Sequence, residues 1–214
     1  MTKTTTAISR RDERIRQRRA QILNAARACV INEGFHAATI SRIGAVAAMS
    51  KGHIYKYYEN KEEIMIALVE HHMHEFNALI SQVDQSEGRN VNSLVQSFAN
   101  KLPAILASDR TILWLEVQAE AARNPKVKEM VKKSAANFRE TIRKVIEPVL
   151  ERQKEEELDF RVEMLLISMH GLGLKATIHS DPDFESLATA VEFAFGTSLS
   201  TASQSVPIRK AKAA

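Results

Sequence analysis

Apolar residues recur along this chain at the three- and four-residue spacing of one helix face, and the pattern predicts helices from end to end. Over residues 12–33 this face is marked by Ile22, Ala26 and Val30, and Gly34 follows where a helix stop is wanted. No alternating run of β-branched residues lies between turn dipeptides. We therefore expect an all-α fold.

Shorter helices follow the first one, and each begins at a residue that can cap it. Thr39 precedes a second helix, Ser50 a third that ends at about Tyr57, and Asn60 a fourth that continues towards Leu79. About three residues separate the second helix from the third, which is typical of a helix-turn-helix.

Five further helices are predicted after a polar stretch at 86–90. They span about 91–107, 109–123, 125–155 with a break at Pro148, 158–179 and 183–200. Residues 201–214 are polar and basic without an apolar pattern, so we expect a flexible basic tail there.

Charge is distributed unevenly along the chain. Residues 1–61 contain twelve Lys and Arg against four Asp and Glu, a net charge of +8, whereas the rest contains 18 against 22, a net charge of −4. A basic segment on an acidic remainder favours a module that binds a polyanion. A merely soluble surface is the alternative that charge alone leaves open.

Other classes of protein find no support in the sequence. The single cysteine, Cys29, lies among apolar residues, so we expect its side chain to be buried. A lone cysteine, which cannot form an intramolecular disulfide, indicates a reducing compartment. Neither a signal sequence nor an apolar stretch approaching 18 residues is present, so we expect a soluble cytoplasmic protein without a membrane partner. No phosphate loop or nucleophile elbow indicates an enzyme or a cofactor. The run HHMH places His71 and His74 on one helix face beside Glu75, but two imidazoles without a third ligand make a poor metal site.

All three tyrosines of the chain lie in the segment that follows Ser50. On a helical wheel centred on Ile54, Tyr58 and more loosely Tyr57 lie on the buried side, whereas Tyr55 lies at the flank. We interpret Tyr58 as a core residue. Tyr55 is a rigid side chain pointing outward, where a phenol can hydrogen-bond a phosphate or contact a thymine methyl. Three tyrosines packed in a core beside solvated lysines is the alternative.

Residues 39–64, TISRIGAVAAMSKGHIYKYYENKEEI, resemble the DNA-binding motif of TetR-type transcriptional repressors. The shared features are a capping Thr, a Ser-Lys-Gly start to the third helix, a Tyr-x-Tyr-Phe-like end and an Asn-Lys-Glu-Glu start to the fourth. The similarity extends over about residues 15–66. It implies that the third helix enters the major groove of double-stranded DNA, with His53 at a position that varies among relatives and tunes sequence choice. The DNA contacts that it implies are Thr39, Ser50, Lys51, Gly52, His53, Tyr55, Lys56 and Lys61.

Two positions depart from the family pattern. Ala48 stands where relatives usually have Gly in the turn, so a positive φ there would cost on the order of 1 kcal/mol, or the turn is formed differently. Gly44 stands where Ala is usual, which weakens the second helix slightly.

An arginine-rich arm is expected before the first helix. It could follow the DNA backbone or enter the minor groove, although a solvated helix face explains residues 14–19 equally well. Its arginines are Arg10, Arg11, Arg14, Arg16, Arg18 and Arg19.

For the rest of the chain the resemblance implies a helical domain that dimerises and binds a small molecule. The implied domains are 1–66 for DNA binding, 67–200 for ligand binding and dimerisation, and 201–214 as the tail. Apolar stripes on the last two helices, with small residues that permit close approach, are our choice for a homodimer interface, and packing within one chain is the alternative. The chosen positions are Leu165, Met169, Leu172, Gly173, Ala176, Leu187, Val191 and Phe195.

A ligand pocket is less clearly marked. Relatives place the helix that carries Trp114 against their effector, and Glu116 or Glu120 pointing inward would favour a cationic or hydrogen-bonding ligand. Each candidate fits plain core packing as well. The candidates are Phe98, Trp114, Glu116, Gln118, Glu120, Phe138, Met164 and Ser168.

Together these features predict a ligand-responsive repressor that binds a palindromic operator as a dimer and is released by an effector of unknown identity. The regulated gene could encode an efflux pump. A regulator of a metabolic or catabolic operon and a regulator without an effector are alternatives. From another class, a helical interaction module could use the basic N-terminal region to bind acidic surfaces.

Overall fold

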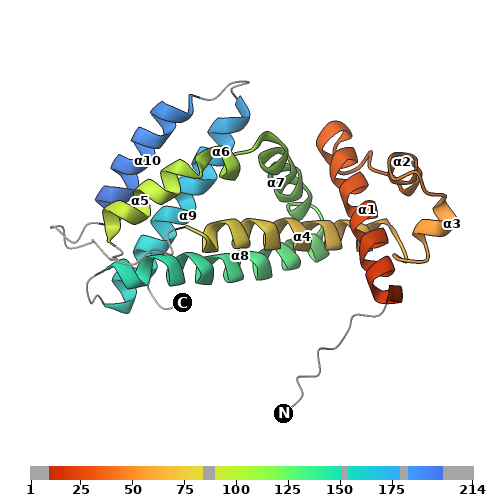
Figure 1. The fold of residues 1–214 in the computed structure, drawn as a ribbon, viewed down its shortest axis with the longest axis horizontal. Coiled ribbons are helices and arrows are strands. Elements are labelled where there is room, and N and C mark those ends of the chain that lie inside the picture. Colours follow the sequence, from red (N-terminus) through yellow and green to blue (C-terminus); the bar gives the residue numbers. More distant parts are fainter. Residues whose placement is uncertain (1–9, 84–89, 151–153, 179–182, 200–214) are drawn as a thin grey trace, which may run out of the picture. The chain divides into compact units, whose positions relative to one another are not determined.

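The structure, a computed structural model, describes residues 10–83, 90–150, 154–178 and 183–199. Every regular element in these ranges is a helix, and the prediction of an all-α fold is confirmed (Figure 1). The tail predicted at 201–214 lies outside the described residues, as do residues 1–9.

The chain divides into two compact units. Residues up to His72 form the first unit together with Ile112–Val131, and Met73–Thr111 form the second together with residues from Lys132 onwards. The first unit contains α1 (Arg10–Glu33), α2 (Ile40–Val46), α3 (Lys51–Ile54) and parts of α4 (Lys61–Ser81), α7 (Ser108–Ala121) and α8 (Pro125–Ile146). The second contains α5 (Val91–Asn100), α6 (Leu102–Ile105), the 3-10 turn η1 (Glu147–Val149), α9 (Glu155–Ile178), α10 (Phe184–Leu199) and the remaining parts of α4, α7 and α8.

Side-chain caps set the starts of the short helices. The hydroxyl of Thr39 accepts the Arg42 N–H at 3.2 Å, and the hydroxyl of Ser50 accepts the His53 N–H at 3.2 Å. Asn60 accepts the N–H of Glu63 at 2.9 Å immediately before α4. Each bond satisfies an amide that the first turn of a helix leaves unpaired, so the three predicted caps are confirmed.

Several helix boundaries differ from those expected, and the basic arm is one of them. Helix α1 already begins at Arg10, so all six arginines assigned to an arm lie on the helix itself. The single helix expected over 91–107 is two helices that meet at Lys101, because Pro103 lacks an N–H and cannot continue α5. At the expected break, α8 ends at Ile146 and Pro148 lies in η1.

The core of the first unit forms where α1 packs against α2 and α2 against α3. Ile22 of α1, Ile43 of α2, Ile54 of α3 and Ile64 of α4 are fully buried. Cys29 is buried as predicted, and burial raises the pKa of its thiol, which keeps the thiol protonated and inert. These contacts position the exposed side of α3.

In the second unit, α10 packs against α5 and α9 (Figure 1). The rings of Phe98 on α5 and Phe195 on α10 lie with their centroids 4.9 Å apart. An ion pair joins α8 to α9 in the same unit, with the Arg143 guanidinium 3.3 Å from the Asp159 carboxylate.

Candidate DNA-binding surface and ligand cavity

The turn between α2 and α3 uses a left-handed alanine. Ala48 has φ 52°, and the N–H of the next residue, Met49, donates to the Gly44 carbonyl at 2.8 Å. The Ala48 N–H donates to the Ala45 carbonyl at 3.3 Å. This is the pattern of a Schellman helix end, which usually has glycine at the left-handed position. Of the two alternatives that the sequence left open, the structure has the positive φ with its steric cost.

Gly44 has a packing function that the sequence does not reveal. A Cβ at this position would lie 2.7 Å from the Met49 carbonyl oxygen and 3.4 Å from the Ile54 Cδ1. The first distance is too short for any side chain, because the Met49 backbone is held by its own hydrogen bond to Gly44. Glycine at this position therefore lets the turn close over α2, a role in addition to the slight weakening of the helix that the sequence predicts.

The three tyrosines separate largely as predicted. Tyr58 is 3% exposed and lies under the Arg19 guanidinium, 4.9 Å from its ring centroid, and burial raises the pKa of its phenol. Tyr55 is 53% exposed. Tyr57 is half-buried and packs on His53, with ring centroids 5.6 Å apart and its hydroxyl 3.5 Å from Nε2. Tyr57 therefore supports the orientation of His53 rather than the core.

The outward side of α3 carries the polar residues assigned to DNA. The helix is shorter than expected, but hydrogen bonds from Tyr55 N–H to the Lys51 carbonyl (3.0 Å) and from Tyr58 N–H to the Ile54 carbonyl (3.1 Å) continue the turn. Gly52 faces open space, and a Cβ added there would have no neighbour within 4 Å. The exposed members of the assigned set are Thr39, Ser50, Lys51, Gly52, Tyr55 and Lys56, and His53 is half-buried.

Lys61, assigned from the resemblance to DNA, has internal partners. Its ammonium donates to the carbonyls of Phe35 and His36 at 2.8 and 2.9 Å and lies 5.9 Å from the Phe35 ring centroid. Partial burial lowers the pKa of this amine. Lys61 therefore anchors the loop between α1 and α2.

Helix α7 holds the same loop through two carboxylates. Glu116 accepts the Phe35 N–H at 2.9 Å, over 81 positions of sequence. Glu120 is only 5% exposed, with one oxygen 3.4 Å from His36 Nε2 and the other accepting from the Asn124 amide at 3.2 Å. We call residues 34–36 with Glu116, Glu120 and Lys61 the loop clamp. No local sequence pattern predicts it, because its partners come from three distant segments.

The arginines of α1 have mixed environments. Arg19 donates to the Tyr57 carbonyl at 3.1 Å and pairs with Glu63 at 3.7 Å, so it ties α1 to the segment after α3. Arg16 pairs with Glu13 one turn away, and Arg18 donates to Gln21 at 2.8 Å. Arg14 is exposed. A helix face in solvent describes these residues better than an arm.

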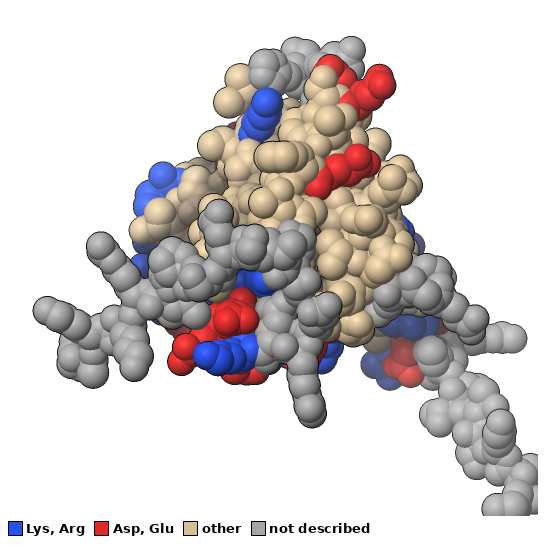
Figure 2. All heavy atoms as spheres, turned by 90° about the vertical axis from the view of Figure 1, so that its left-hand side faces the viewer, with Lys and Arg blue, Asp and Glu red and all other residues tan. Residues whose placement is uncertain are grey.

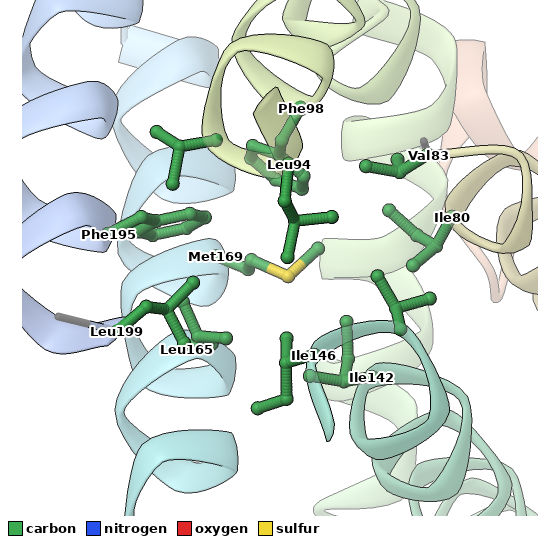
Figure 3. A pocket seen from close by; sticks show the side chains of 12 residues that line it. Ile80, Val83, Leu94, Phe98, Ile142, Ile146, Leu165, Met169, Phe195 and Leu199 are labelled. Atoms are coloured by element: carbon green, nitrogen blue, oxygen red, sulfur yellow. The ribbon is translucent and has the colours of Figure 1, made fainter. Parts of the chain in front are cut away.

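The eight ligand candidates are not brought together in one unit. Trp114, Glu116, Gln118 and Glu120 belong to the first unit, and Phe98, Phe138, Met164 and Ser168 belong to the second. Phe138 packs on Phe76 with centroids 5.1 Å apart, and the Ser168 hydroxyl donates to the Met164 carbonyl of its own helix at 2.8 Å. Within the second unit a cavity of about 30 Å³ lies between α4, α5, α8, α9 and α10 (Figure 3). Phe98 is the candidate that lines it.

The helices chosen for a dimer interface turn different residues outward from those expected. Leu165, Leu187, Val191 and Phe195 are buried within the protomer, Met169 lines the cavity, and Leu172, Gly173 and Ala176 are half-buried on α9. The structure thus favours packing within one chain for the buried four. The large apolar side chains that α9 and α10 expose are Phe160, Ile167, Leu174, Ile178 and Phe193.

We call these five residues the exposed apolar face. Its most exposed members are Ile178 at 72% and Phe193 at 78%. Figure 2 looks onto the side of the second unit that carries α10 and α5, where a broad area of the described surface is free of Lys, Arg, Asp and Glu. An apolar surface of this kind typically marks a contact with another macromolecule.

The structure bears on two further features, a metal site at the histidine run and a membrane-spanning helix. Among the described residues no group of three or more His, Cys, Asp or Glu could hold a metal ion, and within the HHMH run His72 is buried while His74 is exposed. In the same ranges no helix is long and apolar enough to cross a membrane.

Comparisons with known proteins agree with this geometry. Residues 22–68 match the model of "Bacterial regulatory proteins, tetR family", and residues 94–196 match that of "BetI-type transcriptional repressor, C-terminal". The HTH-type transcriptional regulator UidR of Escherichia coli is 28% identical over 179 residues, covering 83% of this chain and 88% of UidR. Members of this family are DNA-binding regulators and not enzymes, as the sequence predicted.

Solved structures have the same fold. A putative TetR-family transcriptional regulator from Mesorhizobium loti superposes with a TM-score of 0.73 at 18% identity, over 87% of this chain and 96% of that one. Salmonella enterica GusR superposes with a TM-score of 0.67 at 22% identity, over 86% and 95%. This chain belongs to the TetR family of bacterial transcriptional regulators.

Proposed function

We propose that this chain is a repressor that binds a palindromic operator as a homodimer and releases it when a small molecule binds the second unit. The observation that carries this proposal is the difference in burial on and just after α3. Ile54 and Tyr58 are buried, whereas Tyr55 and Lys56 are exposed. A helix held from one side and polar on the other fits the major groove.

On the outward side of α3 the residues take different roles. Lys51 and Lys56 neutralise phosphates, which gives affinity without sequence preference. Tyr55 contacts a phosphate or a thymine methyl, and His53, supported by Tyr57, reads a base edge. Thr39, Ser50 and Gly52 lie where the DNA backbone approaches. Lys61 is moved from the phosphate contacts to the loop clamp, because its ammonium already donates to two carbonyls.

A homodimer would cover the exposed apolar face. Phe160, Ile167 and Leu174 recur every seven residues along α9, so they share one side of the helix, and Phe193 of α10 is exposed as well. Burying such side chains against a second copy contributes about 1.5–3 kcal/mol each. A two-fold axis then presents two α3 helices to half-sites about one helical turn, ~34–36 Å, apart.

The effect of ligand binding in the second unit would reach the first unit through helices that contribute to both units. Helix α4 carries Lys61 in the first unit and the cavity residue Ile80 in the second, and α7 carries Glu116 and Glu120 of the loop clamp. An effector that shifts either helix changes the position of the loop that precedes α2. The coupling needs only a difference in effector affinity between the two arrangements. Control of an efflux pump is our first hypothesis for the regulated gene, and the sequence of the bound operator identifies it.

Selection of binding sites from a random duplex library tests the proposal. We expect a site with two-fold symmetry, bound far more tightly than a scrambled duplex, with an affinity that falls steeply as salt rises. Equal affinity for the selected and scrambled duplexes would instead favour a helical module that binds acidic surfaces.

A further inference from the structure

The cavity of the second unit is unusual in its chemistry. Among the described residues, all twelve side chains that line it are apolar, and they come from α4, α5, α8, α9 and α10 and from Val83, which follows α4. Figure 3 shows Ile80, Leu94, Ile142, Leu165 and Phe195 around a central space. Its volume of about 30 Å³ would accommodate a water molecule, but a buried water needs two to four polar partners, and none of the lining side chains offers one. The space is therefore unfavourable for water.

Met169 is the side chain that can enlarge this space. Its thioether lies in the middle of the lining residues in Figure 3, and its side chain is only half-buried. Methionine has three rotatable bonds and no branch at Cβ, so it changes conformation with less strain than the branched side chains around it. Rotation of Met169 away from the centre would open room next to the Phe98 and Phe195 rings.

We infer that this cavity binds an unbranched, uncharged alkyl chain, which enters as Met169 moves aside. A hydroxyl, amide or charged group inside the cavity would lose its bonds to water without gaining a partner, so only the alkyl part of a ligand enters and any polar end stays outside. An alkyl chain has the smallest cross-section of any hydrocarbon ligand and needs the least expansion. This inference rests on the proposed function for the role of the ligand as effector, and it replaces the cationic or hydrogen-bonding ligand expected from Glu116 and Glu120.

Methyl NMR of the full chain, free of DNA, tests the inference with 1-octanol as the probe. With Ile and Met methyl groups labelled, we expect saturable shifts at Ile80, Ile142, Ile146 and Met169. Ile22 and Ile43, buried in the first unit, serve as internal references. Choline and D-glucuronate, added at the same concentrations, should shift none of the cavity methyls. Absence of octanol shifts, or equal shifts with choline, would overturn the inference and leave the cavity as a packing void.

A matched pair of variants separates enlargement of the cavity from general loosening. Met169→Ala should bind 1-octanol about tenfold more tightly, because the removed side chain leaves room for the alkyl chain. Met65→Ala removes a buried methionine from the first unit and should leave octanol affinity unchanged. Equal affinities for Met169→Ala and the unmodified chain would overturn the position of the site.

DNA binding, measured on the same samples, distinguishes the two proposals. Saturating 1-octanol should lower affinity for the selected operator about tenfold. Octanol binding without any change in operator affinity would overturn the role of the ligand as effector. Failure of octanol to bind a chain that still binds its operator overturns this inference alone, and octanol binding by a chain that selects no DNA overturns the proposed function alone.

Discussion

The two units of this chain hold their important residues by different physical means. In the first, directed bonds fix the loop after α1: Glu116 accepts the Phe35 N–H, and Lys61 donates to two carbonyls. In the second, residues around the cavity meet through apolar contact, with the flexible Met169 among them. Hydrogen bonds have a narrow geometry, whereas apolar contacts tolerate rearrangement. A surface that reads DNA needs the first property, and a site that admits a ligand needs the second.

The largest effect is expected in the second unit, from a substitution at Phe193, a member of the exposed apolar face on α10. Phe193→Glu should weaken self-association about 100-fold, or about 3 kcal/mol, because an apolar contact is replaced by a charge that must be desolvated. Sedimentation equilibrium over a range of protein concentrations measures the change. Gln96→Glu on α5 adds the same charge at another exposed position and serves as the control. If Phe193→Glu associates as strongly as the control, the dimer uses another face.

In the first unit, two glycines test how closely the turn is packed. Gly44→Ala should lower the free energy of unfolding by about 2 kcal/mol, because its Cβ would meet the Met49 carbonyl oxygen at 2.7 Å. Gly52→Ala, with open space around it, should change stability by less than about 1 kcal/mol. Urea unfolding of both variants measures the difference. Equal stabilities would show that the Met49 backbone can shift to admit the added Cβ at little cost in free energy.

The loop clamp gives a smaller effect. Glu116→Ala leaves the Phe35 N–H without its acceptor and should destabilise the loop by about 1–2 kcal/mol. Hydrogen exchange of the Phe35 amide should become about tenfold faster, since about 1.4 kcal/mol corresponds to that factor. Glu116→Gln keeps an acceptor oxygen and should restore slow exchange. The clamp would have no holding function if the alanine variant exchanges as slowly as the unmodified chain.

The smallest effect on stability is expected at Ala48, whose backbone lies in the left-handed region. Ala48→Gly removes the steric cost of φ 52° but adds freedom to the unfolded chain, so the net gain in stability should lie between zero and about 1 kcal/mol. Thermal unfolding measures it. A clear loss of stability would contradict the strain assigned to Ala48.

The local features of the first unit could be predicted from the sequence because they depend on neighbours along the chain. The caps at Thr39 and Ser50, and the burial of Tyr58 against the exposure of Tyr55, follow from a period of about 3.6 residues and from backbone amides within three positions. For Ala48 the sequence left two alternatives open, and the structure has the one with the positive φ.

The sequence could not predict the features that depend on distant partners. Glu116 meets Phe35 across 81 positions, so nothing near either residue indicates the contact. Helix α9 is apolar around much of its circumference, with Leu165 buried and Ile167 exposed only two positions later. Periodicity therefore could not separate its inner side from its outer side. The cavity likewise arises where five helices leave space.

Titration of the selected operator with a Tyr55→Phe, Lys56→Ala double variant tests the central claim most directly. The account predicts at least about tenfold weaker binding, with the salt dependence reduced by about one phosphate contact per protomer. Fold and self-association should be unchanged, because both side chains are exposed. Lys133→Ala, on the exposed side of α8, should bind like the unmodified chain. Unchanged affinity of the double variant at fixed salt would contradict the assignment of this face of α3 to DNA.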